Sequence, residues 1–188
     1  MTRKMHPARI ASVAGCSLLS LALAGCGFQL RGAPPVPPGL QPLAVSCVEQ
    51  IPAELCDAVN KQLELGEIDL RSPEKADYLL RLRGFEQDRR ASAITVQASA
   101  AEYTLRQTVR MDVLTRDELP LIAETSLNSS ETYRYDDTNV LAKQREEEEL
   151  RQQLYERLAQ QIIFRLAPLT EARVTELKKA AEENEDAR

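Results

Sequence analysis

The stretch Tyr103-Thr-Leu-Arg-Gln-Thr-Val-Arg-Met-Asp-Val-Leu114 has the most regular pattern in this chain of 188 residues. Apolar and polar side chains alternate along it with a period of two. This alternation predicts a β-strand with one face against a core and the other face open to water. The apolar face holds Tyr103, Leu105, Val109, Met111 and Val113, and the polar face holds Thr104, Arg106, Thr108, Arg110 and Asp112.

Three further strands and a shorter helix are predicted around this stretch. The helix opens at Ile51-Pro52 and ends at Gly66, with apolar side chains four residues apart on one face. In chain order the elements are strand, helix, three strands and a long helix. This order indicates an α+β fold in which two helices pack on one face of a four-stranded mixed or antiparallel sheet. The further strands are expected at residues 43–48, 78–88 and 121–133.

The long helix is predicted from about Thr138 to Ala167, because no Gly or Pro interrupts this segment and Pro168 follows it. Its second half bears an apolar stripe that can pack on the sheet. Its first half, Lys143 to Glu149, is almost wholly charged, and we expect it to cover no core. The stripe consists of Leu150, Leu154, Leu158, Ile162 and Leu166, and Asp136, Asp137 or Thr138 can cap the start of the helix.

The polar face of the predicted sheet is rich in arginine, and two interpretations remain open. The guanidinium groups can bind an anionic partner, since their planar forks match phosphate. Alternatively, they keep an open sheet face hydrated and pair with nearby acids. The residues concerned are Arg81, Arg83, Arg106 and Arg110, with Arg89 and Arg90 near the hairpin that joins two of the strands.

Residues 1–25 have the layout of a secretory leader, with Arg3, Lys4 and Arg9 at the positive end and an apolar run behind them. The run is too short to span a bilayer permanently. It ends in Leu-Ala-Gly-Cys26, the bacterial lipoprotein signal, in which the cysteine takes a diacylglycerol and its freed amine takes a third acyl chain. We therefore expect Cys26 to be the lipid attachment site, and two or more acyl chains anchor stably.

The chain after the leader is predicted to have three parts. Residues 26–42 form a Pro-rich tether, residues 43–168 form a single α+β domain, and residues 169–188 form a polar tail expected to be disordered. Two thiols remain after lipidation, Cys47 and Cys56. They can form a disulfide in an oxidising compartment or serve as two small buried hydrophobes, and their spacing does not decide between these alternatives.

Composition argues against several classes of function. Three of the 24 basic residues and none of the 29 acidic residues lie in the leader, so the remaining 21 and 29 give a net charge of −8, which is unfavourable for nucleic-acid binding. The only histidine, His6, also lies in the leader, which removes His-dependent nucleophiles and His-ligated metals. Ser72-Pro-Glu-Lys75 matches an S-x-x-K motif, but the partner motifs are absent. We expect no enzyme, no cofactor and no metal site.

Two segments resemble the LptE family of lipopolysaccharide-assembly lipoproteins. One is Cys26-Gly-Phe-Gln-Leu-Arg-Gly32, directly after the leader; the other is Asn139-Val-Leu-Ala-Lys143, followed by a Glu-rich stretch and the amphipathic run from Leu154 to Leu166. The order of strands and helices is also similar. The resemblance implies an outer-membrane lipoprotein, anchored from the periplasmic side, that plugs the β-barrel of its partner LptD, helps this barrel to assemble and binds lipopolysaccharide. Gly27, where inner-membrane lipoproteins generally carry Asp, agrees with this location.

The resemblance also indicates candidate ligand contacts. Arg89 and Arg90 near the hairpin tip are expected to meet the phosphates of lipopolysaccharide, together with Lys143, which is carried over through the Leu-Ala-Lys match. The alternative function is that of a lipid-anchored adaptor of another envelope assembly, without any contact to lipopolysaccharide. Co-purification of a barrel protein separates the two.

Overall fold

The computed structural model describes residues 36–94, 100–135 and 139–186. The chain divides into two units, Met1–Gly32 and Ala33–Arg188, and every described residue belongs to the second unit. The predicted leader, the lipidation site Cys26 and residues 27–35 of the predicted tether lie outside the described residues. The helix-cap candidates at 136–138 also lie outside them.

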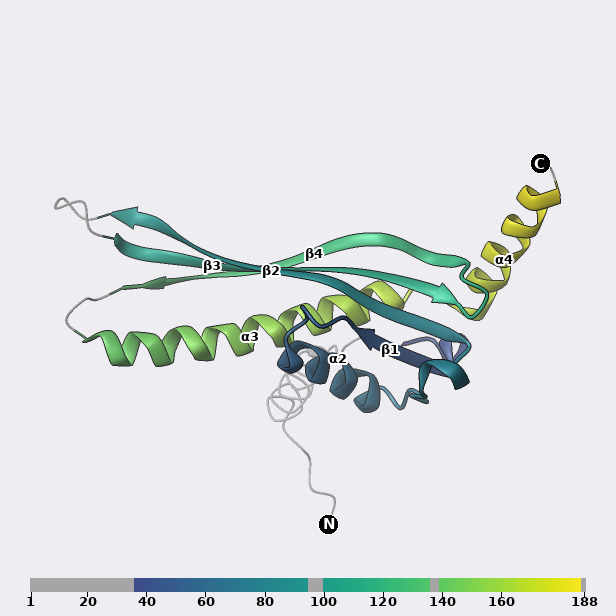
Figure 1. Cartoon of the computed structure of the whole chain (residues 1–188), viewed down its shortest axis with the longest axis horizontal. Helices are drawn as coiled ribbons and strands as arrows, with labels where there is room; N and C mark the ends of the chain where they lie inside the picture. The colour runs from purple at the N-terminus through teal and green to yellow at the C-terminus, as the bar shows by residue number, and fades with distance from the viewer. Residues whose placement is uncertain (1–35, 95–99, 136–138, 187–188) are drawn as a thin grey trace, which may run out of the picture. The chain divides into compact units, whose positions relative to one another are not determined.

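Four strands form one mixed sheet in the order β1-β2-β3-β4 (Figure 1). β1 (Leu43–Cys47) pairs in parallel with β2 (Tyr78–Ile94), and β3 (Ala100–Thr115) and β4 (Pro120–Arg134) continue the sheet in antiparallel pairing. The predicted order of elements and the predicted mixed sheet are confirmed. β2 and β3 extend beyond their predicted ends, because they pair with each other as far as Ile94 and Ala100.

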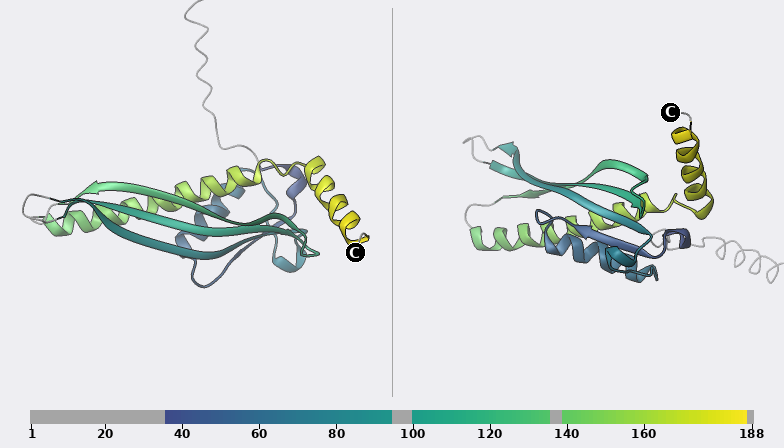
Figure 2. Two further views of the ribbon diagram at one scale, coloured as in Figure 1. Left: turned by 90° about the horizontal axis from the view of Figure 1, so that it is seen from above. Right: turned by 45° about the vertical axis from the view of Figure 1, so that its right-hand side comes forward.

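Two helices cover one face of this sheet, as predicted (Figure 1, Figure 2). α2 (Ala53–Leu65) buries the face that carries Leu55, Val59 and Leu63, and α3 (Val140–Leu166) packs beside it. The opposite sheet face, which bears the polar half of the alternating stretch, is not covered by any described helix. The fold therefore leaves one broad polar surface on strands β2, β3 and β4.

The main core lies between the sheet and the second half of α3. Gln107 is a polar exception on the core-facing side of β3: its side chain is fully buried and donates a hydrogen bond of 2.9 Å to Oε1 of Gln87 on β2. Phe85 and Tyr155 pack with ring centroids 5.9 Å apart. Fully buried side chains of this core include Leu80, Leu82, Val109, Met111, Leu158 and Ile162.

The charged segment of α3 from Lys143 to Glu149 contributes no residue to either buried cluster, as expected, and the apolar stripe begins directly after it. Leu105, Tyr133 and Leu154 form a second buried cluster, and Tyr103 and Leu150 pack against it. The reason is that the apolar alternation of β3 continues to Tyr103 and meets a matching side chain on β4. A narrow apolar strip therefore runs along the sheet beneath the start of the apolar stripe of the helix.

The polar tail also differs from its prediction, because residues expected to be disordered form the helix α4 (Glu171–Asp186). Val174 is buried, and Leu177 packs against the main core. Two apolar side chains one turn apart attach the start of a helix that is otherwise polar, and bulk composition does not reveal such a contact. Among the described helices, none has the length and apolar character needed to cross a bilayer.

α4 begins against the first described residues of the chain. Gly39 lies in a short 3-10 turn, η1 (Pro38–Leu40), where an added Cβ would come within 2.9 Å of the Glu171 backbone. Only a residue without a side chain permits this close approach. Val36, just before the turn, is also buried. The first described residues and the start of α4 therefore meet at the same end of the domain.

Candidate functional site

Arg89 lies on the helix-facing side of β2. A bulge between Leu82 and Gly84 shifts the alternation by one residue, so that Arg89 pairs with the buried Leu105 of β3. Its guanidinium donates to Oε2 of Glu147 on α3 at 2.8 Å and to the Tyr133 hydroxyl at 3.5 Å. We call the group of Arg89, Tyr103, Tyr133, Glu147 and Arg151 the Arg89 cluster.

Two further contacts complete the Arg89 cluster. The Arg89 guanidinium lies 4.3 Å from the centre of the Tyr103 ring, at cation–π distance. Glu147 also accepts a hydrogen bond of 2.6 Å from the Tyr133 hydroxyl and forms an ion pair with Arg151, one helical turn later. The cluster therefore ties the far half of the sheet to the charged half of α3.

The cluster changes the ionisation of its members. Burial raises the pKa of Glu147, but the hydrogen bonds from Tyr133 and Arg89 outweigh it and leave this pKa below its usual value. Burial and the bond to Glu147 raise the pKa of Tyr133 to about 12. The bond to Glu147, together with that to Tyr133, raises the pKa of Arg89. At neutral pH the carboxylate and the guanidinium are therefore charged and engaged with each other.

Arg90, the next residue, projects from the opposite, open face of the sheet. Its side chain is 82% exposed and forms an ion pair of 2.8 Å with Asp88. A shallow depression of about 270 Å³ lies beside it, lined also by Thr104, Arg106 and Ser130. The predicted pair Arg89 and Arg90 is thus divided between the two faces, and Arg90 is the one that an external ligand can reach.

Lys143 lies in the first turn of α3 and forms an ion pair of 2.6 Å with Glu146. Both figures place the start of α3 at the same end of the domain as the last residues of β2 (Figure 1, Figure 2). The structure therefore brings Lys143 toward the hairpin end, but not into contact with Arg89 or Arg90. The same end exposes three apolar side chains: Ile94, Val140 and Leu141.

On the open face of the sheet, charged side chains of neighbouring strands form ion pairs. Arg81 makes a two-pronged contact with Asp112, at 2.8 and 2.6 Å. Glu124 accepts a hydrogen bond of 3.3 Å from Arg110. Arg83 approaches both carboxylates, at 3.3 Å from Asp112 and 3.6 Å from Glu124. Two interpretations of the arginine-rich face were open, and for Arg81, Arg83 and Arg110 the structure shows pairing with nearby acids.

The two open questions about cysteine and serine are answered by position. Cys47 at the end of β1 and Cys56 in α2 form a disulfide, so the bridged alternative holds. Ser72 and Lys75 lie in an exposed turn around η2 (Pro73–Lys75), not at the buried helix start that an acylated serine requires. Among the described residues no group of three or more His, Cys, Asp or Glu side chains is placed to hold a metal ion.

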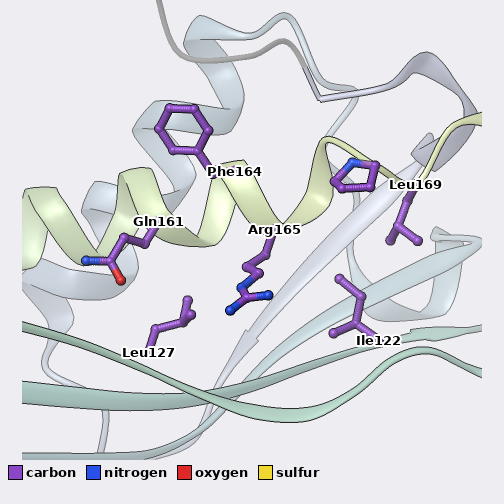
Figure 3. Close-up of a pocket in the computed structure, with 7 residues that line it drawn as sticks. Ile122, Leu127, Gln161, Phe164, Arg165 and Leu169 are labelled. Carbon is purple, nitrogen blue, oxygen red and sulfur yellow. The ribbon is translucent and has the colours of Figure 1, made fainter.

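A second hollow lies on the helix side, where β4 meets the end of α3 (Figure 3). This groove of about 580 Å³ was not expected from the sequence. Arg165 extends from α3 toward the strands and lies between Leu127 and Ile122 in this view. Phe164, on the same helical turn, is 53% exposed although it is aromatic. The groove is lined by Ile122, Leu127, Gln161, Phe164, Arg165, Pro168 and Leu169.

Comparison with known proteins gives a consistent result. The model of a family described as "LptE: Lipopolysaccharide-assembly" matches residues 40–166, which include the whole sheet, α2 and α3. The LPS-assembly lipoprotein LptE of Yersinia enterocolitica is 32% identical over 173 residues, which cover 90% of this chain and 79% of the relative. The protein of the same name from Yersinia pestis is 31% identical over 166 residues, or 86% and 78% of the two chains.

Solved structures support the fold. The solution structure of the uncharacterised lipoprotein B of Nitrosomonas europaea has a TM-score of 0.62 at 17% identity and covers 75% of this chain and 90% of its own. The crystal structure of a minor lipoprotein of Acinetobacter baumannii has a TM-score of 0.57 at 22% identity, with coverage of 67% and 90%. At these identities the likeness concerns the fold alone.

Proposed function

Because this chain belongs to the LptE family of lipopolysaccharide-assembly lipoproteins, we propose that it plugs and helps to assemble the β-barrel LptD in the outer membrane and binds lipopolysaccharide. The family consists of assembly lipoproteins, not enzymes. The acylated Cys26 would anchor the chain from the periplasmic side. The observation that carries the proposal is the family match over residues 40–166, which contain every element of the sheet and α3.

The open sheet face supports the role of a plug. The lumen of a large outer-membrane barrel is polar, so a domain inside it needs a polar surface on which the charged side chains are paired. Strands β2 to β4 present such a surface, since Arg81 with Asp112 and Arg110 with Glu124 neutralise each other on it. A membrane-facing surface would instead be apolar.

The hairpin end supports a role in binding an amphiphile. Lipopolysaccharide combines phosphate groups with acyl chains, and a site for it needs cations beside apolar surface. Arg90 supplies an exposed cation at this end and Lys143 one that is 21% exposed, while Ile94 and Leu141 are exposed apolar side chains, at 68% and 74%. Arg89 is the third proposed contact, and its bond to Glu147 would have to be shared with the ligand.

Two substitutions test the lipopolysaccharide contact. Arg90→Glu with Lys143→Glu should weaken the binding of lipopolysaccharide to the purified chain by about tenfold or more, since each charge-assisted contact contributes roughly 1.5–3 kcal/mol. Arg71→Glu with Lys75→Glu is the matched control, because both residues are exposed cations outside the hairpin end. Equal affinities for the two double variants would reject Arg90 and Lys143 as ligand contacts.

Co-purification tests the barrel partner. Detergent extracts of cells that express the chain should yield a stoichiometric complex with LptD. If the chain is instead recovered with a different envelope assembly and binds no lipopolysaccharide, it is the lipid-anchored adaptor of the alternative interpretation.

A further inference from the structure

The groove beside Phe164 is a place where the described surface does not suit a polar lumen. Five of its seven lining residues are apolar, and one of these, Phe164, is 53% exposed. Exposed apolar surface that is rimmed by polar groups commonly marks a contact with another molecule. The groove lies at the end of the domain away from the hairpin, so the proposed lipopolysaccharide site does not account for it.

Arg165 indicates the charge of the occupant. In the described part of the chain its guanidinium forms no ion pair or hydrogen bond, whereas Arg157, two helical turns earlier, pairs with Glu131 at 2.6 Å. No acidic residue lines the groove. A guanidinium over an apolar floor fits a ligand that carries a carboxylate beside an apolar group.

The strand next to the groove indicates the form of the occupant. β4 is the last strand of the sheet, and no described strand pairs with its outer edge. The carbonyl of Asn128 accepts a hydrogen bond of 3.1 Å from Gln161 on α3, so a helix side chain occupies one backbone group of the strand there. Before this point, Ile122 to Leu127 runs along the groove, and its acid, Glu124, is engaged by Arg83 and Arg110. A free edge of this kind can add an extended peptide by main-chain hydrogen bonds.

We propose that an extended segment of the barrel partner binds along β4 from Ile122 to Leu127, with an apolar side chain in the groove and a carboxylate on Arg165. This inference rests on the proposed function, because it takes LptD as the source of the segment. An acyl chain would fill apolar space but would make no use of the strand edge, so the free edge favours a peptide over a lipid.

Crosslinking tests the proposal in the intact complex. The full-length chain is co-expressed with LptD, and a photo-reactive phenylalanine derivative replaces Phe164 in one variant and Leu65 in another. Leu65 is the matched control, since it is an apolar side chain on α2 that is even more exposed, at 69%. Irradiation should join the chain to LptD from position 164 and not from position 65. The crosslinked peptide, identified by mass spectrometry, should contain an Asp or Glu near an apolar residue.

Charge reversal provides a second measurement. Arg165→Glu should raise the rate at which LptD dissociates by about tenfold, since the loss of one anchoring contact is felt mainly in dissociation. Lys61→Glu, an exposed cation on α2, should leave the rate unchanged. Replacing the acid of the crosslinked peptide by Lys should restore binding of the Arg165→Glu variant.

Four results would overturn the inference. A normal complex in which positions 164 and 65 crosslink alike, or in which Arg165→Glu dissociates like Lys61→Glu, rejects the groove while leaving the proposed function intact. A crosslink from position 164 to lipopolysaccharide assigns the groove to a lipid. Failure of the unaltered chain to form any barrel complex rejects the proposed function, and this inference with it.

Discussion

Replacing Glu147 by Gln should destabilise the domain more than any other single acid-to-amide change on the charged half of α3. Glu147 accepts hydrogen bonds from Tyr133 and Arg89 and pairs with Arg151, and its side chain is only 13% exposed. An amide of the same shape keeps the packing but cannot neutralise two guanidinium groups. Arg89 would then lose its counter-charge, and Arg151 would keep only its ion pair with the exposed Glu148.

The expected loss of unfolding free energy is about 2 kcal/mol. Breaking a fully buried ion pair costs roughly 3–5 kcal/mol, and each hydrogen bond to a charged group contributes roughly 1.5–3 kcal/mol. Arg89 and Arg151 are 43% and 34% exposed, however, so water screens them and part of that loss is recovered. For a domain of this size, 2 kcal/mol corresponds to a fall in melting temperature of roughly 4–8 °C.

The loss should depend on pH in a defined direction. The pKa of Glu147 is lower in the folded chain than its ordinary value of 4.5. Its contribution to stability is therefore complete above this value and disappears as the pH falls through the lower pKa of the folded state. The difference between the parent protein and Glu147→Gln should accordingly shrink in acid.

Thermal and urea unfolding, followed by far-ultraviolet circular dichroism, measure these effects. Glu148→Gln is the control, because Glu148 also bonds Arg151 but is 57% exposed; it should change the free energy by less than about 0.5 kcal/mol. The reasoning is refuted if the two variants unfold alike at neutral pH, or if the deficit of Glu147→Gln persists undiminished in acid.

Three further predictions concern stability and ionisation. The Tyr133 phenol should titrate near pH 12 and not near 10, so its contribution to stability is lost as the pH rises from 10 to about 12; an ultraviolet titration that does not change with Tyr133→Phe would contradict this. Reduction of the disulfide between Cys47 and Cys56, nine residues apart, should lower the unfolding free energy by about 2–3 kcal/mol, whereas an unchanged urea midpoint would contradict it. Leu158→Ala should lower the unfolding free energy by about 2–5 kcal/mol, because Leu158 is fully buried. Leu141→Ala should leave it almost unchanged, because the Leu141 side chain is 74% exposed. Similar melting temperatures for the two variants would disprove the burial argument.

The architecture was largely predictable because the residues with the clearest periodic patterns are also the residues that pack in the core. The alternation from Tyr103 to Leu114 does place its apolar half on the core, and the stripe from Leu154 to Leu166 does face the sheet. The helix α4 was not predictable from composition, since its attachment depends on two side chains and on the room left by Gly39.

The candidate site was harder to predict because a single bulge decides which side chains face outward. Counting by twos from Leu82 places Arg89 with Arg83 on the open face, whereas the shift before Gly84 turns it toward the helix. No local signal in the sequence marks that shift unambiguously. The groove at Phe164 depends on how β4 and α3 approach each other, which the sequence does not show. The sequence contains one signal for it: Phe164, an aromatic residue beside Arg165, lies on the side of the helix away from the buried stripe.

The contact between η1 and the start of α4 lies at the end of the domain where α3 finishes, and α3 runs from there to the hairpin end (Figure 1). α3 has 27 residues, which at about 1.5 Å each makes a rod of roughly 40 Å, close to the full thickness of a bilayer with its headgroups. If the tether fixes one end of α3 at the near leaflet and the helix lies along the barrel axis, the hairpin end reaches the far leaflet. Under the proposed function, a glycolipid could be handed over there while the anchor never leaves the near side.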